Sequence, residues 1–233
     1  MKIKKLISAL VLGSMLVGLS GCNITDFSAE NLLRPPKAVG DEAEIEQLIA
    51  KTADSGYTLK YPKNGKFRSA IIMTDLDGND SNEAVAFFRN SAETSSVHML
   101  VMYSKDNSWE IASDNIFETT DIDSVDFADL TGNGKAEIIV NSTTYTPNVG
   151  KLSCYSYSEG KTNEVGSGQS CSSFVTGDFD NDGTSEIMSL VLYTTENEAL
   201  ASMLDYNEDS KSLYAKAMAN MDPNVVKYKN IAV

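Results

Sequence analysis

From residue 57 to the end, the chain alternates short apolar runs, rich in β-branched and aromatic residues, with clusters of Gly, Asn, Asp and Ser. This pattern is typical of β-strands joined by turns. We therefore predict an all-β region over residues 57–233, built of four-stranded units. The strands of the first unit are expected at 69–73, 84–88, 98–103 and 108–111, and those of the third at 173–175, 187–193, 200–206 and 213–217.

Residues 41–56 have a different pattern. In the run DEAEIEQLIA, Ile45, Leu48 and Ile49 recur at helical spacing and share one face, and the acidic residues fall in the first turn, where the helix dipole favours them. The pattern predicts one short helix that packs against the sheets.

Three segments of the β-rich region align with one another, each consisting of a strand, an acidic loop and a second strand. Their leading residues are Asp75, Asp129 and Asp178, so successive repeats begin 54 and 49 residues apart. This period is typical of a four-stranded propeller blade. We expect a β-propeller-type array of three blades, with residues 225–233 as the first strand of a fourth.

Three blades are too few to close a propeller, whose range begins at about four. An incomplete propeller is therefore expected. The favoured explanation is that the chain is a fragment of a longer protein, and the alternative is an unusually small array that the last strand closes.

Each loop carries oxygen-bearing side chains at positions 1, 3, 5 and 9 of the pattern DxDxDGxxE. These candidate ligands are Asp75, Asp77, Asn79 and Glu83 in the first loop; Asp129, Thr131, Asn133 and Glu137 in the second; and Asp178, Asp180, Asp182 and Glu186 in the third. Alternate side chains of a tight loop converge on one point. The backbone carbonyls at position 7 (Ser81, Lys135 and Thr184) would help to complete the six to eight oxygens that Ca²⁺ takes.

Position 6 of the loops requires a sharp turn. Gly134 and Gly183 permit the positive φ of such a turn, and Asp80 tolerates it better than most residues do. An EF-hand is excluded because its closing glutamate belongs at position 12 and a helix should follow. Here the acid is at position 9, and strand-forming residues follow it.

The repeated loop resembles the VCBS and FG-GAP repeats, the calcium-binding repeats of integrin-type β-propellers. Over roughly residues 30–233, including the runs Arg34-Pro35-Pro36-Lys37 and Leu59-Lys60-Tyr61-Pro62, the chain resembles VCBS-repeat lipoproteins of Gram-positive bacteria. The resemblance implies a propeller with structural calcium. Thr131 and Asp80 depart from the motif.

Ligand charge is a principal determinant of calcium affinity. The third loop offers four carboxylates, the first loop three and the second loop two. We therefore expect affinity to fall in the order third, first, second, with the second loop a candidate for an empty site.

The N-terminus indicates export. Lys2, Lys4 and Lys5 precede an uncharged apolar run over residues 6–19, which is shorter than the roughly 20 residues of a membrane-spanning helix. The run ends in Leu-Ser-Gly-Cys22, which resembles the lipobox of bacterial lipoproteins. We expect a signal peptide over 1–21, a lipidated Cys22 with a tether over 22–40, and a location on the extracytoplasmic face of the cell membrane. The alternative is an ordinary cleaved signal with a chance cysteine.

Two more cysteines, Cys154 and Cys171, stand in an exported and therefore disulfide-permissive setting. A disulfide between them and two free thiols on neighbouring strands are both open, because the sequence does not give their separation.

The net charge and the lack of a familiar catalytic motif disfavour several classes of function. The formal net charge of −14 disfavours nucleic acid as a partner. The single histidine, His98, and Trp109 are expected to be strand and core residues, and Asp121 and Asp123 to be solvated charges rather than a glycosidase pair. We expect a non-enzymatic binding, scaffold or adhesion module for an extracellular protein or glycan. The alternatives are a glycan- or cell-wall-active hydrolase and a solute-binding lipoprotein.

Overall fold

The structure, a computed structural model, describes residues 40–54, 56–194 and 196–224. The chain divides into two compact units, Met1–Ala38 and Val39–Val233, and the described residues belong to the second unit. The expected signal peptide, lipidated Cys22, nearly all of the tether, and the expected strand at 225–233 lie outside the described residues. Within the described part, no helix is long and apolar enough to span a membrane.

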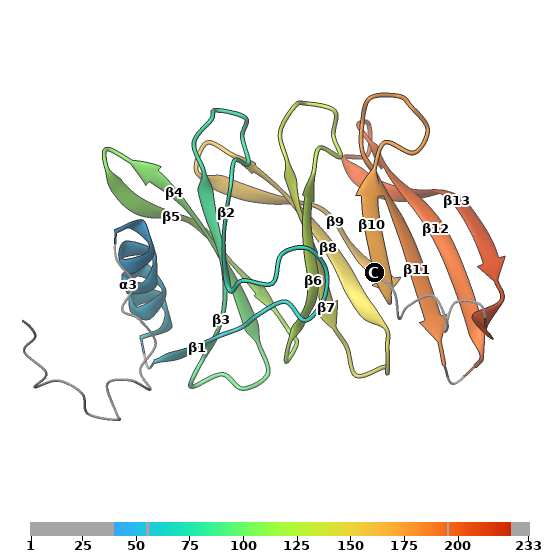
Figure 1. Cartoon of the computed structure of the whole chain (residues 1–233), viewed down its shortest axis with the longest axis horizontal. Coiled ribbons are helices and arrows are strands. Elements are labelled where there is room, and N and C mark those ends of the chain that lie inside the picture. Colours follow the sequence, from blue (N-terminus) through green and yellow to red (C-terminus); the bar gives the residue numbers. More distant parts are fainter. Residues whose placement is uncertain (1–39, 55, 195, 225–233) are drawn as a thin grey trace, which may run out of the picture. The chain divides into compact units, whose positions relative to one another are not determined.

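The β-rich region forms three antiparallel sheets that follow one another along the chain (Figure 1). The first sheet consists of β1 (Tyr57–Leu59), β2 (Ile71–Thr74), β3 (Glu83–Asn90), β4 (Val97–Lys105) and β5 (Ser108–Phe117). The second consists of β6 (Ile122–Ala128), β7 (Glu137–Thr143), β8 (Gly150–Ser158) and β9 (Lys161–Cys171). The third consists of β10 (Ser173–Gly177), β11 (Glu186–Tyr193), β12 (Glu198–Asn207) and β13 (Ser212–Met221).

The strands of the second and third sheets pair in sequence order, as in a meander, and so do β2 to β5 of the first sheet. All the strands expected in the first and third units are present, and the outer strands β5 and β13 are longer than predicted. The described residues are thus mostly β with one helix, and they form no closed barrel or propeller.

The first sheet contains a strand that the pattern did not predict. β1 pairs antiparallel with β3, with Tyr57 opposite Asn90 and Leu59 opposite Phe88. β2 also pairs with β3, so two short segments share one edge of the same strand. Only three residues of β1 are extended, which is too short for a periodic signal.

The predicted helix is confirmed as α3 (Asp41–Ala53), with Asp41, Glu42 and Glu44 in its first turn. Ile45 and Ile49 are fully buried, and the helix packs on the outer face of the first sheet.

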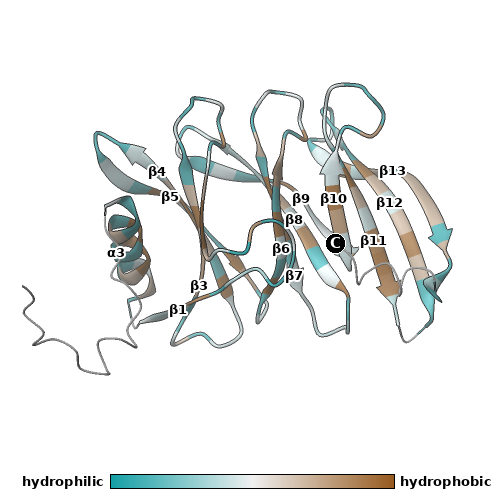
Figure 2. Cartoon of the chain, in the orientation of Figure 1, coloured by the Kyte–Doolittle hydropathy of each residue, from teal (hydrophilic) through white to brown (hydrophobic). Residues whose placement is uncertain are grey.

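Most of the core lies in three apolar layers. Figure 2 shows the hydrophobic residues of the strands in brown. One layer lies between α3 and the first sheet, where Phe88 and Trp109 are buried. The second lies between the first and second sheets and includes Phe87 and Ile138, and the third lies between the second and third sheets and includes Ile139. The central strands β3 and β7 are buried on both faces, which explains their continuous apolar runs. Trp109 is a core residue, as expected.

Candidate metal-binding loops

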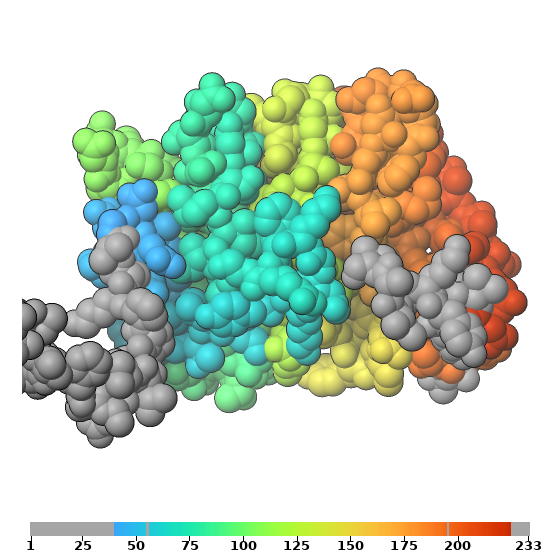
Figure 3. Space-filling model, viewed as in Figure 1, coloured from blue at the N-terminus to red at the C-terminus, as the bar shows by residue number. Residues whose placement is uncertain are grey.

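The three acidic loops connect the first two strands of the repeat in each sheet: β2 to β3, β6 to β7, and β10 to β11. They lie in a row along one edge of the sheets, at the top of Figure 1, and form three neighbouring projections on the surface in Figure 3. The repeat seen in the sequence is therefore a structural repeat with equivalent positions.

The leading aspartate of each loop organises the turn by accepting backbone hydrogen bonds. The oxygens of Asp75 accept the amides of Gly78 at 2.8 Å, Asn79 at 3.2 Å and Asp80 at 2.9 Å. Asp129 and Asp178 accept the amides of positions 5 and 6 in the same way, at 2.7–3.1 Å. These amides hold the pKa of Asp75 below its usual value, although partial desolvation opposes them. The backbone amides therefore fix the aspartate at position 1 in place in each loop.

The closing glutamate ties the second strand back to the start of the loop. One oxygen of Glu83, Glu137 and Glu186 accepts the amide of the residue at position 2, at 2.8 Å in each loop. All three glutamates are at most 3 % exposed. Burial raises the pKa of each, and that of Glu137 reaches about 6. A carboxylate buried in this way is stabilised in its charged form by a nearby cation.

Position 6 has the positive φ that the sequence predicted. φ is 65° at Asp80, 79° at Gly134 and 94° at Gly183. The residue at position 4 is left-handed as well, which the sequence reading did not anticipate, with φ of 74° at Gly78. The two turns make each loop compact enough for its side chains to converge.

Neighbouring loops are bonded to each other through their backbones. The amide of Ala136, in the second loop, donates to the carbonyl of Leu76, in the first, at 3.0 Å. The amide of Ser185, in the third loop, donates to the carbonyl of Asp129, in the second, at 2.8 Å. The loops therefore also connect the three sheets.

Carboxylate oxygens converge in two of the loops. In the third loop, one oxygen from each of Asp178, Asp180, Asp182 and Glu186 lies within 4.8 Å of the others. In the first loop, the same is true of Asp75, Asp77 and Glu83. The oxygen ligands are of the kind that Ca²⁺ and similar hard cations take.

Each of these two clusters contains a buried oxygen without a hydrogen-bond partner among the described residues. In the first loop it is Oδ1 of Asp77, and in the third it is Oε1 of Glu186, a residue that is 0 % exposed. An unpaired buried carboxylate oxygen is costly, and a bound cation would satisfy it. The donor sets of the first and third loops therefore fit a hard metal ion.

The second loop satisfies itself instead. Thr131 takes the place of the position-3 aspartate, and its hydroxyl donates to Oε1 of Glu137 at 3.3 Å, while Leu130 donates to Oε2. No group of three acidic ligands is found in this loop, all of which is described. The expected order of affinity stays a prediction.

The residues predicted at positions 5 and 7 hydrogen bond to each other. The side-chain oxygens of Asn79, Asn133 and Asp182 accept the amides of Ser81, Lys135 and Thr184, at 2.7–2.9 Å. Coordination by the position-7 carbonyls stays a prediction.

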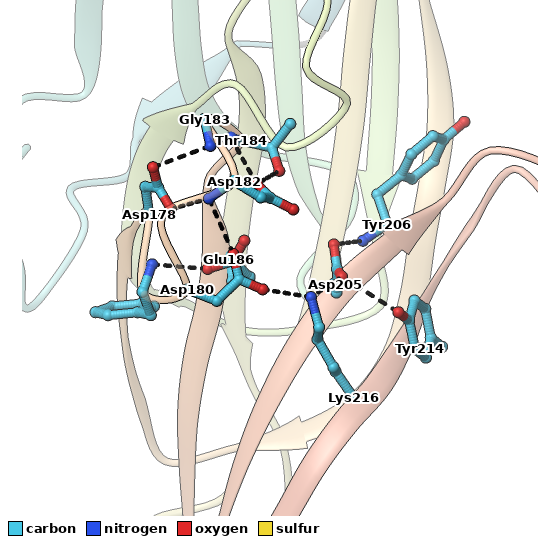
Figure 4. A network of polar contacts seen from close by, with 11 residues as sticks. Asp178, Asp180, Asp182, Gly183, Thr184, Glu186, Asp205, Tyr206, Tyr214 and Lys216 are labelled. Atoms are coloured by element: carbon cyan, nitrogen blue, oxygen red, sulfur yellow. Dashed lines mark hydrogen bonds and ion pairs between the residues drawn. The ribbon is translucent and has the colours of Figure 1, made fainter.

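A lysine that the motif does not contain reaches the third loop (Figure 4). Nζ of Lys216, on β13, bonds to Oδ2 of Asp180 and, at 2.9 Å, to Oδ2 of Asp205 on β12. Oδ1 of Asp180 accepts the amide of Asp182 at 3.2 Å, so both oxygens of Asp180 are engaged. Lys216 follows Asp180 by 36 residues, and no loop pattern could have revealed it.

The two remaining cysteines are free thiols, both 0 % exposed. Cys154 lies opposite Gly166, whereas Cys171 lies opposite Gly150, four residues earlier on the same strand as Cys154. Four residues of strand span about 13 Å, well beyond the Cα separation of a disulfide. Of the two alternatives, the structure has the free thiols.

Other polar candidates have structural partners. His98 lies in β4, with Nδ1 2.9 Å from Asp114 and Nε2 3.3 Å from Glu93, and its ring stacks on Phe88. We expected Asp121 to be a solvated charge, and this was wrong. Lys60 and Lys63 form ion pairs with it.

Asp123 is also engaged rather than solvated. It accepts hydrogen bonds from Asn64 at 2.9 Å and from Asn141 at 3.3 Å. Both expectations failed because the partners come from other segments of the chain, which the sequence pattern does not place beside Asp121 and Asp123.

Comparison of the sequence with known proteins does not identify a family for the chain. No protein-family profile matches the chain, and no curated protein is significantly similar to it.

Proposed function

We propose that the chain is a calcium-binding, propeller-type repeat protein of the VCBS and FG-GAP kind, anchored to the outer face of the cell membrane through Cys22. The observation that carries the proposal is the pair of convergent carboxylate clusters in equivalent loops, each with an unpaired buried oxygen. Calcium at these points neutralises the acidic loops and stabilises the turns.

The role proposed for calcium is structural rather than catalytic. Each cluster lies in a loop whose backbone bonds to a neighbouring loop, so an ion there restrains the boundary between two sheets. A ligand that binds only the folded state stabilises it in proportion to its affinity and concentration. The membrane-anchored part then serves as a non-enzymatic binding, scaffold or adhesion module for an extracellular protein or glycan.

Calcium titration of the purified polypeptide tests the proposal. Isothermal titration calorimetry of the wild type is expected to show binding at two loops, and thermal melting in excess calcium is expected to exceed melting in chelator. Asp75→Asn should remove the step of the first loop, and Asp178→Asn that of the third. Asp129→Asn, in the second loop, is the matched control and should leave both steps.

Two results would contradict the proposal. One is identical melting in chelator and in calcium, without heat of binding. The other is hydrolysis of a cell-wall glycan that is lost on changing one acidic residue outside the loops, which would favour the enzyme alternative.

A further inference from the structure

The outer strand of each sheet contains a β-bulge at the same place. In the first sheet, Met102 pairs with Ile111 and Val101 with Ser113, so Ala112 is the extra residue. The same shift leaves Val165 as the extra residue of β9 and Lys216 as that of β13. The positions are equivalent in the three sheets. Next to the bulge, the neighbouring strand (β4, β8 or β12) pairs with the residue that follows the closing glutamate.

The bulge residue has a different chemistry in the third sheet. Ala112 packs against the layer between the first and second sheets, and Val165 is buried between the second and third. A bulge turns its extra side chain away from the regular alternation of the strand. In the third sheet the side chain so placed is an ammonium, and it reaches the metal-binding loop instead of an apolar layer (Figure 4).

Lys216 meets the loop at the position-3 carboxylate, one of the four oxygen donors in the third cluster. In the first loop the equivalent Asp77 keeps Oδ1 free of any partner among the described residues. In the third loop the two oxygens of Asp180 are taken by Lys216 and by the amide of Asp182. A cation entering the third loop therefore has to compete for Asp180.

Asp205 holds the lysine in this position. Its Oδ2 accepts Lys216 at 2.9 Å and the hydroxyl of Tyr214 at 3.2 Å, and its side chain is 12 % exposed. The ammonium is therefore attached at a fixed place beside the cluster. The unpaired Oε1 of Glu186 shows that Lys216 does not satisfy the whole cluster, so an oxygen ligand for a second cation remains.

We propose that Lys216 is a tethered competitor of the metal ion in the third loop, which weakens calcium binding there and offsets the extra carboxylate that this loop has over the first. This inference rests on the proposed function. It removes the advantage that counting carboxylates gave the third loop over the first, because the first loop has no lysine paired with its cluster among the described contacts.

The test is calorimetric titration with calcium in an Asp75→Asn background, where only the third loop is expected to bind. Lys216→Met removes a unit positive charge close to a divalent ion and should tighten binding about tenfold at low ionic strength. Lys216→Gln, a second neutral variant, should tighten it as well. Lys216→Arg keeps the charge and should stay within about twofold of the background protein.

Lys151→Met is the matched control for net charge. Lys151 is exposed and lies opposite Ser142, near the end of β7 remote from the acidic loop. It should leave the affinity within about twofold, since screened charges at a distance interact weakly. Equal tightening by Lys151→Met would overturn the inference, because the effect would then be one of overall charge.

The failures of the two proposals are distinguishable. If the Asp75→Asn protein binds calcium and the added Lys216→Met change makes it bind no more tightly, the role of Lys216 is refuted and the proposed function stands. If neither the wild type nor any Lys216 variant binds calcium, the proposed function fails, and this inference fails with it.

Discussion

Replacing Thr131 with valine tests whether the second loop is stabilised from within. Valine has nearly the same shape as threonine, so the change removes the hydroxyl without opening a cavity. It deletes the 3.3 Å hydrogen bond to Oε1 of Glu137, a carboxylate that is 1 % exposed. Because no ion is needed for this bond, the prediction is independent of any metal.

The loss in the free energy of unfolding follows from the buried acceptor. An unsatisfied buried acceptor costs about 1–3 kcal/mol. Because the hydrogen bond from Thr131 is long, we expect a loss in the lower half of this range, at about 1–2 kcal/mol. For a unit the size of Val39–Val233, 1 kcal/mol lowers the melting temperature by about 2–4 °C. Thr131→Val should therefore melt about 2–8 °C below the wild type.

Circular dichroism melting in excess chelator is the appropriate assay. Thr131→Ser keeps the donor and is the control, with a melting temperature expected between those of Thr131→Val and the wild type. If Thr131→Val melts at the wild-type temperature, Thr131 does not stabilise Glu137 and the second loop has no internal substitute for a cation.

Three further outcomes are expected. Gly132→Ala should lower the melting temperature, because φ is 71° at Gly132 and an added Cβ would lie 2.5 Å from Cγ2 of Thr184; an unchanged melt would show that the third loop moves freely. Burial raises the pKa of Glu137 from about 4.5 in the unfolded chain to about 6, so the contribution of Glu137 to stability is present below about pH 4.5 and is lost as the pH rises through about 6. Urea unfolding in chelator should show that Glu137→Gln loses this pH dependence. Parallel curves of stability against pH for the wild type and the variant would contradict the prediction. Cys154 and Cys171 should react with a thiol reagent only after denaturation, and reductant should leave the melt unchanged, whereas a reductant-sensitive melt would indicate a disulfide.

The periodic parts of the fold could be predicted from the sequence. The spacing of Ile45 and Ile49 predicts helix α3, and continuous apolar runs predict the strands that follow the acidic loops. The positive φ at position 6 was predictable because Gly134 and Gly183 tolerate it.

What could not be predicted depends on contacts between distant segments. The pairing of β1 with β3 and the bulge that carries Lys216 are set by register, which three extended residues or one extra residue do not reveal in a sequence. The convergence of oxygens could be predicted from the 1-3-5-9 spacing. That Thr131 closes the second loop by itself, and that Asp180 is shared with a lysine, required the side-chain positions.

The backbone hydrogen bonds from Ala136 to Leu76 and from Ser185 to Asp129 link the three acidic loops across both boundaries between the sheets. We therefore expect the opening of one loop to disturb its neighbour, because opening either loop breaks a hydrogen bond that both share. Because such coupling is reciprocal, a ligand that stabilises one loop should also stabilise the adjoining loops against opening, and its dissociation should remove that stabilisation from all of them.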